Sequence, residues 1–321
     1  MSKVGQIAGV SLLLSLAPSL AWSEEKLDQL KIAVGARGAY ENQISEVGQE
    51  QGFFKKRGLK LDVLYTQGGG ESLQAVISGS VDIGISIGTL GALGAYAKGA
   101  PIRVIANSMV GPYEFWYVRA ESPIKTFKDA AGKTVAYSTK GSSTYLMVLT
   151  LEQQFGVKVE PTATGNPVAT LTQVMSGQID VGYTTPPLVL DALAAGKIRR
   201  IARSDDIPAM AKQTVRFVLA NADALAKRPD VFRRYMQGYR DVIDWMYTDP
   251  AAIPAYAKWS GVSEDVAKWT RDDYVPKDRV NPNRVEGLEE MMADAVAYKF
   301  LSAPLSAEQL KTLIQLQEPI K

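Results

Sequence analysis

Ser78-Gly79-Ser80-Val81-Asp82-Ile83-Gly84 occurs a second time in this chain, as Ser176-Gly177-Gln178-Ile179-Asp180-Val181-Gly182. An amphipathic stretch precedes each copy, and a second apolar stretch and an arginine-led strand follow it. The offset between the two glycines is 177 − 79 = 98 residues. A single unit of helix, glycine and strand is common in α/β folds, but the long matched order predicts two similar α/β lobes. Small ligands bind in clefts between such lobes.

The composition excludes several classes of function. A chain of 321 residues can form one large or two medium domains, each with its own core. The formal net charge is +2, which gives no electrostatic footprint for nucleic acid. The sequence has no cysteine and no histidine, which excludes disulfides, thiolate or imidazole metal sites and nucleophile–histidine mechanisms. We therefore expect no catalytic residue, no metal and no cofactor.

Residues 1–23 have the pattern of a secretory signal peptide. One positive charge precedes an apolar stretch over 4–16, and Ala21 and Ser23 stand at the −3 and −1 positions of a cleavage site before Glu24. A membrane anchor is the alternative, but the stretch is short for a hydrocarbon core of about 30 Å. No cysteine is available for lipid attachment. We expect a soluble protein of the periplasm.

Strand and helix patterns alternate twice along the chain, which favours two mostly parallel sheets covered by helices on both faces. The first unit has expected strands at 30–34, 59–65, 81–85, 103–106 and 113–118, with helices at 44–56, 71–78 and 90–98. The second has expected strands at 134–137, 158–161, 179–183 and 198–202, with helices at 143–155, 168–175 and 188–195.

The last third of the chain predicts one returning strand, 214–219, followed by helices only. Apolar residues three to four apart mark one face of a long helix that begins at Pro229, namely Val231, Tyr235, Tyr239, Val242 and Met246. Further helices are expected at 250–258, 263–271, 285–300 and 306–316, the last with a capping box at its start.

These patterns predict how the chain divides. After the signal segment, 1–23, residues 24–119 together with 214–321 form one lobe, and residues 120–213 form the other. The two crossings between the lobes, near 119–123 and 211–216, make a hinge.

Several motifs resemble those of a known family. Gly35-Ala36-Arg37-Gly38-Ala39-Tyr40 and the stretch from Glu50 to Leu59 resemble the opening of periplasmic solute-binding proteins of the nitrate/sulfonate/taurine type. That superfamily also includes binding proteins for pyrimidine precursors of thiamine. Gly68-Gly69-Gly70, the first copy of the repeat and the stretch from Pro123 to Lys133 resemble its further motifs. The resemblance implies a bilobal type II periplasmic-binding-protein fold with a helical C-terminal region, serving an ABC importer.

The resemblance also implies where the ligand binds. It places the ligand against loops at the carboxyl ends of strands, where open α/β sheets bind ligands in general. The candidate ligand-binding residues are Arg37, Tyr40, Gly70, Glu71, Ser86, Thr89, Glu114, Thr139, Lys140, Gly141, Ser142, Ser143, Asn166 and Thr185.

The stretch 138–144 is the strongest local indication of a ligand-binding segment, because small hydroxyl residues and Lys140 join a strand to a helix there. A helix N-terminus with hydroxyl donors favours an anion. Ordinary N-capping beside a solvated lysine is the alternative. In the first loop, Tyr40 offers an aromatic ring for stacking and a hydroxyl for hydrogen bonding. Arg37 offers bidentate hydrogen bonding to a carboxylate or sulfonate.

Two acidic residues complicate an anion site. Glu114 could bind an amine-bearing ligand, or it could pair with Arg119 or Lys133 as part of the structure. Glu71 has the same ambiguity, because an acidic first turn also complements the helix dipole. A cleft that both carboxylates face would disfavour a simple anion. The matched acids of the repeat, Asp82 and Asp180, are interpreted as structural, remote from the cleft.

The sequence therefore predicts a monomeric extracytoplasmic receptor and no enzyme. It would capture a small organic ligand, such as a sulfonate or carboxylate, and deliver it to an ABC permease in the inner membrane. The alternatives are an exported sensory receptor and a binder of an amine-bearing heteroaromatic precursor. The superfamily includes a thiamine-pyrimidine synthase that relies on histidine, which this chain lacks.

Overall fold

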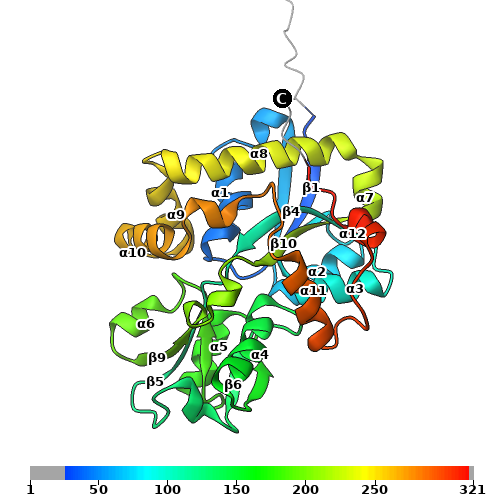
Figure 1. Ribbon diagram of the computed structural model, residues 1–321. Helices are drawn as coiled ribbons and strands as arrows, with labels where there is room; N and C mark the ends of the chain where they lie inside the picture. Colours follow the sequence, from blue (N-terminus) through cyan, green and yellow to red (C-terminus); the bar gives the residue numbers. More distant parts are fainter. Residues whose placement is uncertain (1–25, 318–321) are drawn as a thin grey trace, which may run out of the picture.

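The protein has two α/β lobes, drawn one above the other in the computed structural model of Figure 1, which describes residues 26–317. The predicted signal segment, 1–23, lies outside the described residues. The first lobe is built on a five-stranded sheet of order β2-β1-β3-β10-β4. The second lobe holds a three-stranded sheet of order β8-β5-β9 and the strand pair β6-β7. The predicted bilobal α/β fold is confirmed.

The strands of the described chain are short. They are β1 Asp28–Val34, β2 Leu59–Tyr65, β3 Ile83–Gly88, β4 Ile102–Val110, β5 Phe115–Arg119, β6 Thr134–Tyr137, β7 Glu160–Ala163, β8 Gly182–Thr184, β9 Ile198–Arg203 and β10 Thr214–Asn221.

The α-helices cover the sheets and form the C-terminal region. They are α1 Gln43–Glu50, α2 Gly69–Ile77, α3 Thr89–Ala97, α4 Ser143–Phe155, α5 Pro167–Met175, α6 Leu190–Ala194, α7 Ala222–Lys227, α8 Pro229–Thr248, α9 Ala252–Ser260, α10 Glu264–Trp269, α11 Leu288–Ala297 and α12 Ala307–Leu313. Shorter turns include the 3-10 helix η1 Tyr40–Asn42 and a π-helical turn at Thr270–Tyr274.

The two lobes repeat one strand order. In the second lobe, Ala136 N donates to Val181 O at 2.8 Å and Val181 N donates to Thr134 O at 3.0 Å, which joins β6 to the start of β8. The resulting order, β7-β6-β8-β5-β9, matches β2-β1-β3-β10-β4 strand for strand. The repeated heptapeptide leads into β3 and β8, which occupy the same place in the two orders. The sequence repeat is therefore also a structural repeat.

One strand in each sheet runs against its neighbours, contrary to a purely parallel arrangement. In the first lobe β10 is antiparallel to β3 and β4, and in the second β5 is antiparallel to β8 and β9. Each of these strands follows a strand of the opposite lobe, so each enters its sheet directly after the chain has crossed between lobes. The crossings run through 111–114 and 204–213. The first crossing lies before the predicted position near 119–123, because Phe115–Arg119 pair within the second sheet. The predicted division of the chain at 119/120 stays a prediction.

The matched acids of the repeat each accept from a backbone N–H of the neighbouring strand. Lys31 N donates to Asp82 Oδ2 at 2.8 Å, and Thr134 N donates to Asp180 Oδ2 at 3.1 Å. Asp82 also pairs with Arg228 at 2.6 Å. Asp82 thus bonds to the middle of β1 and Asp180 to the first residue of β6, which supports the structural interpretation of the pair.

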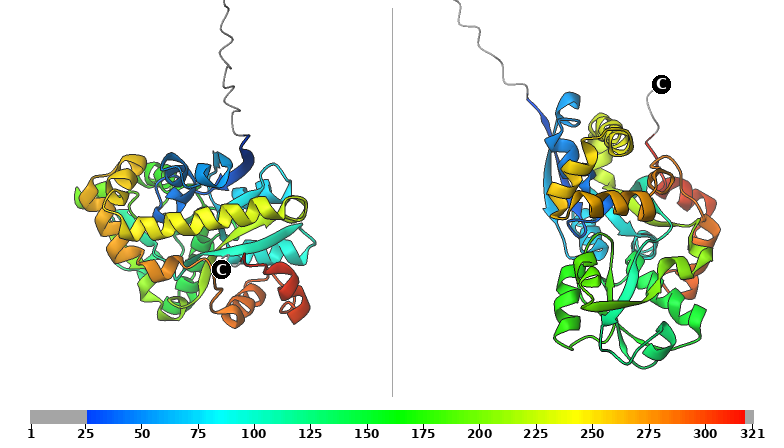
Figure 2. Two further views of the ribbon diagram at one scale, coloured as in Figure 1. Left: turned by 90° about the horizontal axis from the view of Figure 1, so that it is seen from above. Right: turned by 90° about the vertical axis from the view of Figure 1, so that its left-hand side faces the viewer.

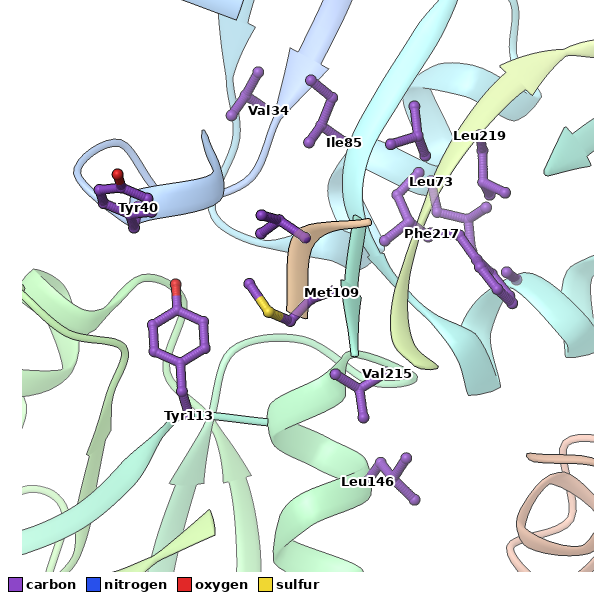
Figure 3. Packing of buried hydrophobic residues seen from close by; sticks show 14 of the residues in the cluster. Val34, Tyr40, Leu73, Ile85, Met109, Tyr113, Leu146, Val215, Phe217 and Leu219 are labelled. Carbon is purple, nitrogen blue, oxygen red and sulfur yellow. The ribbon is translucent and has the colours of Figure 1, made fainter. Parts of the chain in front are cut away.

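The long helix α8 confirms the apolar spacing read from the sequence. Its predicted face, from Val231 to Met246, is buried. α8 lies across the first lobe, as the view from above in Figure 2 shows, and Tyr235 stacks on Phe54 with ring centroids 5.4 Å apart. The buried apolar side chains form one cluster that continues into the second lobe, from Val34 to Leu146 in Figure 3. The lobes are therefore packed against each other as well as connected.

The helices of the described chain include none that is both long and apolar enough to cross a membrane.

Replacing the second repeated acid tests its structural role. Asp180→Ala removes the acceptor of the Thr134 amide and hydroxyl, 3.1 and 2.9 Å away, and we expect a loss of about 1 kcal/mol in the free energy of unfolding. Chemical denaturation measures the loss. Asp62→Ala, at an exposed position of the edge strand β2, is the matched control. An equal effect of both substitutions would contradict the assigned role.

Candidate functional site

A small cavity lies between the lobes. Its volume is about 50 Å³, and residues of both lobes line it. The first lobe contributes residues 35–36, 39, 41–42, 67–69, 86 and 216, and the second contributes 138, 142–144, 167, 183 and 185.

The fold brings these residues together by placing strand ends and helix starts around one point. Gly35 follows β1, Ser86 lies near the end of β3, Ser138 follows β6 and Thr185 follows β8. The helices α2, α4 and α5 begin at the cavity with Gly69, Ser143 and Pro167. The carboxyl ends of strands are the general ligand-binding edge of open α/β sheets. The cavity therefore lies at the edge of the sheets where a ligand site was expected from the sequence, and binding of a ligand there stays a prediction.

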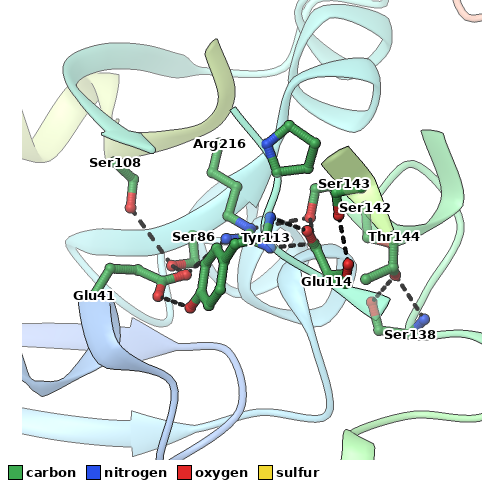
Figure 4. Close-up of polar contacts among 12 residues, drawn as sticks. Glu41, Ser86, Ser108, Tyr113, Glu114, Ser138, Ser142, Ser143, Thr144 and Arg216 are labelled. Atoms are coloured by element: carbon green, nitrogen blue, oxygen red, sulfur yellow. Dashed lines mark hydrogen bonds and ion pairs between the residues drawn. The ribbon is translucent and has the colours of Figure 1, made fainter. Parts of the chain in front are cut away.

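A buried arginine between two glutamates forms the base of the site (Figure 4). Arg216 Nη1 donates to Glu41 Oε1 at 2.9 Å, and Nη2 donates to Glu114. The side chains of Arg216, Glu41 and Glu114 are only 5%, 2% and 0% exposed. Burial opposes the charge of Arg216, but the two carboxylates outweigh it, so the pKa of Arg216 lies above its ordinary value. The guanidinium is therefore a permanent charge within the protein.

Tyr113 completes this cluster as a neutral donor. Its hydroxyl donates to Glu41, its backbone N–H donates to Glu114 Oε2 at 2.9 Å, and its ring lies 5.2 Å from the Arg216 guanidinium. Burial, and then the charge of Glu41, raises the pKa of Tyr113 well above its ordinary value. The phenol therefore stays protonated and keeps donating to the carboxylate.

The loop 138–144, predicted as an anion site, already holds a carboxylate of the protein. Ser142 caps α4 by accepting from Tyr145 N at 3.2 Å. Ser143, the first residue of the helix, donates to Glu114 Oε1 at 3.1 Å and accepts from Arg216 Nε at 3.0 Å. The negative charge that the N-terminus of α4 favours is therefore supplied by Glu114.

Ser86 is held in an unusual backbone conformation at the cavity wall. Its φ is +59°, in the left-handed region that side chains other than glycine adopt rarely. Its hydroxyl donates to Asn42 Oδ1 at 2.6 Å, while Asn42 Nδ2 donates to the carbonyls of Gly35 and Ala36. Backbone strain of this kind collects at functional sites because the surrounding contacts hold it in place.

An outer pocket of about 440 Å³ adjoins the cavity. Ala36, Gln67 and Pro167 line both spaces. Asn166 Nδ2 donates to Gln67 Oε1 at 2.8 Å, so this amide pair joins the two lobes where the spaces meet. The rest of the outer pocket is largely apolar, with Val168 60% exposed to it and to solvent. Opening the amide pair would connect the inner cavity with this larger space.

Most of the predicted ligand-binding residues come together. Ser86, Ser142, Ser143 and Thr185 line the cavity, and Glu114 lies directly behind it. Four more lie where the lobes touch: Gly70 N donates to Thr139 Oγ1 at 2.9 Å, Gly141 O accepts from Gly91 N at 3.0 Å, and Asn166 pairs with Gln67.

The structure does not bring the other five to the cavity. Tyr40 is buried in the first lobe, where its ring packs on Tyr256 and Tyr247. Arg37 lines the outer pocket and pairs with Glu46 at 3.4 Å. The remaining three lie on helix starts and a loop outside the cavity: Glu71 is exposed, Thr89 is buried with no hydrogen bond to its hydroxyl, and Lys140 is exposed on a separate groove.

Four residues that line the cavity were not predicted from the sequence: Glu41, Asn42, Gln67 and Arg216. A signal for Arg216 was present, because this arginine interrupts an otherwise apolar strand, Thr214-Val215-Arg216-Phe217-Val218-Leu219. A charge at such a position has to find a buried partner. Glu41 carried no such signal, since it follows Tyr40 in a loop where a solvated carboxylate is ordinary.

The described residues hold no cluster of three or more acidic side chains that could bind a metal ion.

Solved structures with the same fold include two binding proteins. One is the alkanesulfonate-binding protein SsuA of Xanthomonas axonopodis pv. citri bound to MOPS, with a TM-score of 0.75, 20% identity and coverage of 90% of this chain and 98% of that chain. The other is the periplasmic nitrate-binding protein NrtA of Synechocystis PCC 6803, with a TM-score of 0.71, 13% identity and coverage of 90% and 86%. These likenesses confirm the periplasmic-binding-protein fold.

The sequence also matches a 4-amino-5-hydroxymethyl-2-methylpyrimidine phosphate synthase of Saccharomyces cerevisiae, at 23% identity over 217 residues. The match covers 64% of this chain and 63% of that protein, so the chain spans less than two thirds of the yeast relative. The sequence pattern of a family described as NMT1/THI5 like matches residues 45–253, which is more than half of the chain. The resemblance stated from the motifs is confirmed, and the chain belongs to the NMT1/THI5 like family.

Proposed function

We propose that the protein is an extracytoplasmic solute-binding receptor, which captures a small organic ligand between its lobes and passes it to an ABC importer. The observation that carries this proposal is the cavity enclosed by strand ends and helix starts of both lobes. The polar groups that enclose it are hydroxyls, the amides of Asn42 and Gln67, Glu41 and Arg216, all of which can form hydrogen bonds. Preorganised donors and acceptors of this kind, shielded from water, suit tight binding without chemical change of the ligand.

The size of the cavity implies that the lobes must open to admit a ligand. A volume of about 50 Å³ has room for little more than water or a very small solute. The lobes meet here through direct contacts, namely the amide pair of Gln67 and Asn166 and the bond from Gly70 to Thr139. The structure therefore corresponds to a closed form. A ligand that prefers the closed form shifts the population toward it.

Glycines allow this close approach of the lobes. Gly88 and Gly91, at the start of α3, contact the backbone of Gly141 and Ser142. A Cβ atom on Gly88 would lie 2.6 Å from Ser142 Cα and would also collide with the Gly141 carbonyl. Gly88 has φ −62° and ψ 140°, which any residue adopts. An alanine there is therefore compatible with the fold of the first lobe but not with closure.

We predict that Gly88→Ala holds the lobes apart. The radius of gyration, measured by small-angle X-ray scattering, should increase relative to the unsubstituted protein, while the far-UV circular dichroism spectrum stays the same. Gly91→Ala is the milder comparison, because its Cβ would be 3.2 Å from the Gly141 carbonyl oxygen. We expect a smaller increase in the radius of gyration for this variant. Equal radii for all three proteins would argue against closure through this contact.

The ligand class has two candidates. Small anions are suggested by the neighbours that bind alkanesulfonate and nitrate. Arg216, which lines the cavity, gives three of its five N–H groups to Ser143, Glu41 and Glu114. An amine-bearing ligand is favoured by Glu41, which lines the cavity, and by Glu114 behind it. The yeast relative's name contains an aminopyrimidine, which belongs to the second class. Both candidates are small enough to reach the site once the lobes open.

A thermal-shift screen of alkanesulfonates, carboxylates and aminopyrimidines tests the receptor function. Binding raises the midpoint of unfolding with ligand concentration. For a compound that binds, Thr185→Ala and Ser142→Ala should each weaken binding by about 1–3 kcal/mol, because each removes a buried hydrogen-bonding group from the cavity.

Lys140→Ala is the matched control, because Lys140 is exposed and lies outside the cavity. A compound whose binding depends on Lys140 but on neither hydroxyl would move the site to the separate groove. A screen in which no compound shifts the midpoint would count against the receptor function.

The partner also follows from the proposal. A receptor that serves an importer needs a membrane permease to receive the ligand, and the predicted signal peptide would export the receptor to the periplasm. An exported sensory receptor would use the same cavity and the same closure. Uptake of the identified ligand by cells with and without the gene separates the two, because only the importer function predicts a loss of uptake on deletion.

A further inference from the structure

We propose that Glu41 and Glu114 make the cavity selective for a ligand whose buried head group is cationic or a neutral N–H donor, and that they exclude simple anions. The inference rests on the receptor function proposed above and goes beyond it by assigning the sign of charge that the site accepts. Glu41 contacts the ligand and Glu114 acts through Arg216 and Ser143.

The charges around the cavity are few and nearly desolvated. Among the described residues that line it, only Glu41 and Arg216 carry a formal charge. Glu114 lies behind the wall and bonds to Arg216 and Ser143. Two carboxylates and one guanidinium sum to a formal charge of −1. Because their side chains are 5% exposed or less, neither water nor salt screens this excess effectively.

Helix N-termini around the cavity would by themselves favour an anion, but carboxylates of the protein already occupy two of them. Glu114 accepts from Ser143 at the start of α4. Glu71, in the first turn of α2, accepts from Gln67 N at 2.7 Å. An anionic ligand would therefore gain less from these helices and would approach carboxylates held in place.

The remaining hydrogen-bonding capacity suits a ligand with donors. Glu41 accepts at one oxygen from Arg216, at 2.9 Å, and at the other oxygen from Tyr113. The Ser86 hydroxyl lies 3.4 Å from the first oxygen, but it gives its one hydrogen to Asn42 at 2.6 Å. A carboxylate has about four acceptor positions. A ligand N–H can thus add a bond to Glu41. A ligand with an acceptor beside that donor can also use the spare N–H groups of Arg216.

Three isosteric probes test the charge preference directly. Acetamidinium, acetamide and acetate share one planar shape and differ in charge. We expect binding in the order acetamidinium, acetamide, acetate, with at least roughly a tenfold difference in dissociation constant between the first and the last. Titrations followed by ¹H–¹⁵N chemical-shift changes, at constant ionic strength, measure the three constants. Acetate binding as tightly as acetamidinium, or no binding of acetamidinium, would overturn the proposal.

Isosteric variants assign the preference to the glutamates. Glu41→Gln keeps the size of the side chain and removes one negative charge, so the ratio of the acetamidinium and acetate constants should fall by about tenfold. Glu114→Gln should lower the same ratio by a smaller factor, because Glu114 does not face the cavity. Glu50→Gln, an exposed acid at the end of α1 and outside the cavity, is the matched control and should leave the ratio unchanged. An unchanged ratio in Glu41→Gln refutes the assignment.

Failure of this inference differs visibly from failure of the receptor function. If the wider screen finds an organic anion whose binding is lost in Thr185→Ala, the receptor function stands and the charge assignment is wrong. If neither the screen nor the three probes show binding, both are wrong.

Discussion

The buried ion cluster of Arg216 with Glu41 and Glu114 is the interaction on which the other features of the site depend. It lies where the chain crosses between lobes: Glu114 belongs to the first crossing, and Arg216 lies just beyond the second. Ser204, at the start of the second crossing, donates to the Glu114 carbonyl at 2.7 Å. Removing one partner of such a cluster leaves an uncompensated buried charge, which typically costs about 3–5 kcal/mol. The same residues therefore hold the crossings together and define the charge of the cavity.

The architecture explains why the cluster can serve both purposes. Each sheet receives one antiparallel strand from the chain that has just left the other lobe, β5 in one and β10 in the other. Arg216 lies on β10 and reaches Ser143, at the start of α4 in the opposite lobe, with an Nε–Oγ distance of 3.0 Å. A movement of one lobe relative to the other would therefore change the distances between the residues of the cluster. The cluster thus links the two lobes directly through Arg216.

Local patterns predicted the fold well and the site only in part. The repeated heptapeptide and the apolar spacing along α8 depend on neighbours in sequence, so they led to the correct order of elements. Arg216 bonds to residues 175 and 102 positions away, and no local pattern specifies such partners. Tyr40 illustrates the converse. Its loop position suggested the cleft, but Tyr247 and Tyr256, from the distant C-terminal helices, enclose its ring in the core.

The loop 138–144 shows how the protein itself can fill a position that favours negative charge. A strand that leads through hydroxyl residues into a helix creates a place for negative charge, and the fold supplies that place irrespective of the ligand. In this chain Glu114 fills it from within the protein, through its bond with Ser143 at 3.1 Å. Once the favourable position is filled, a second negative charge meets repulsion without the compensating helix terminus. In the proposed receptor, the fold determines where the ligand binds, whereas the two buried glutamates determine which charge it can carry.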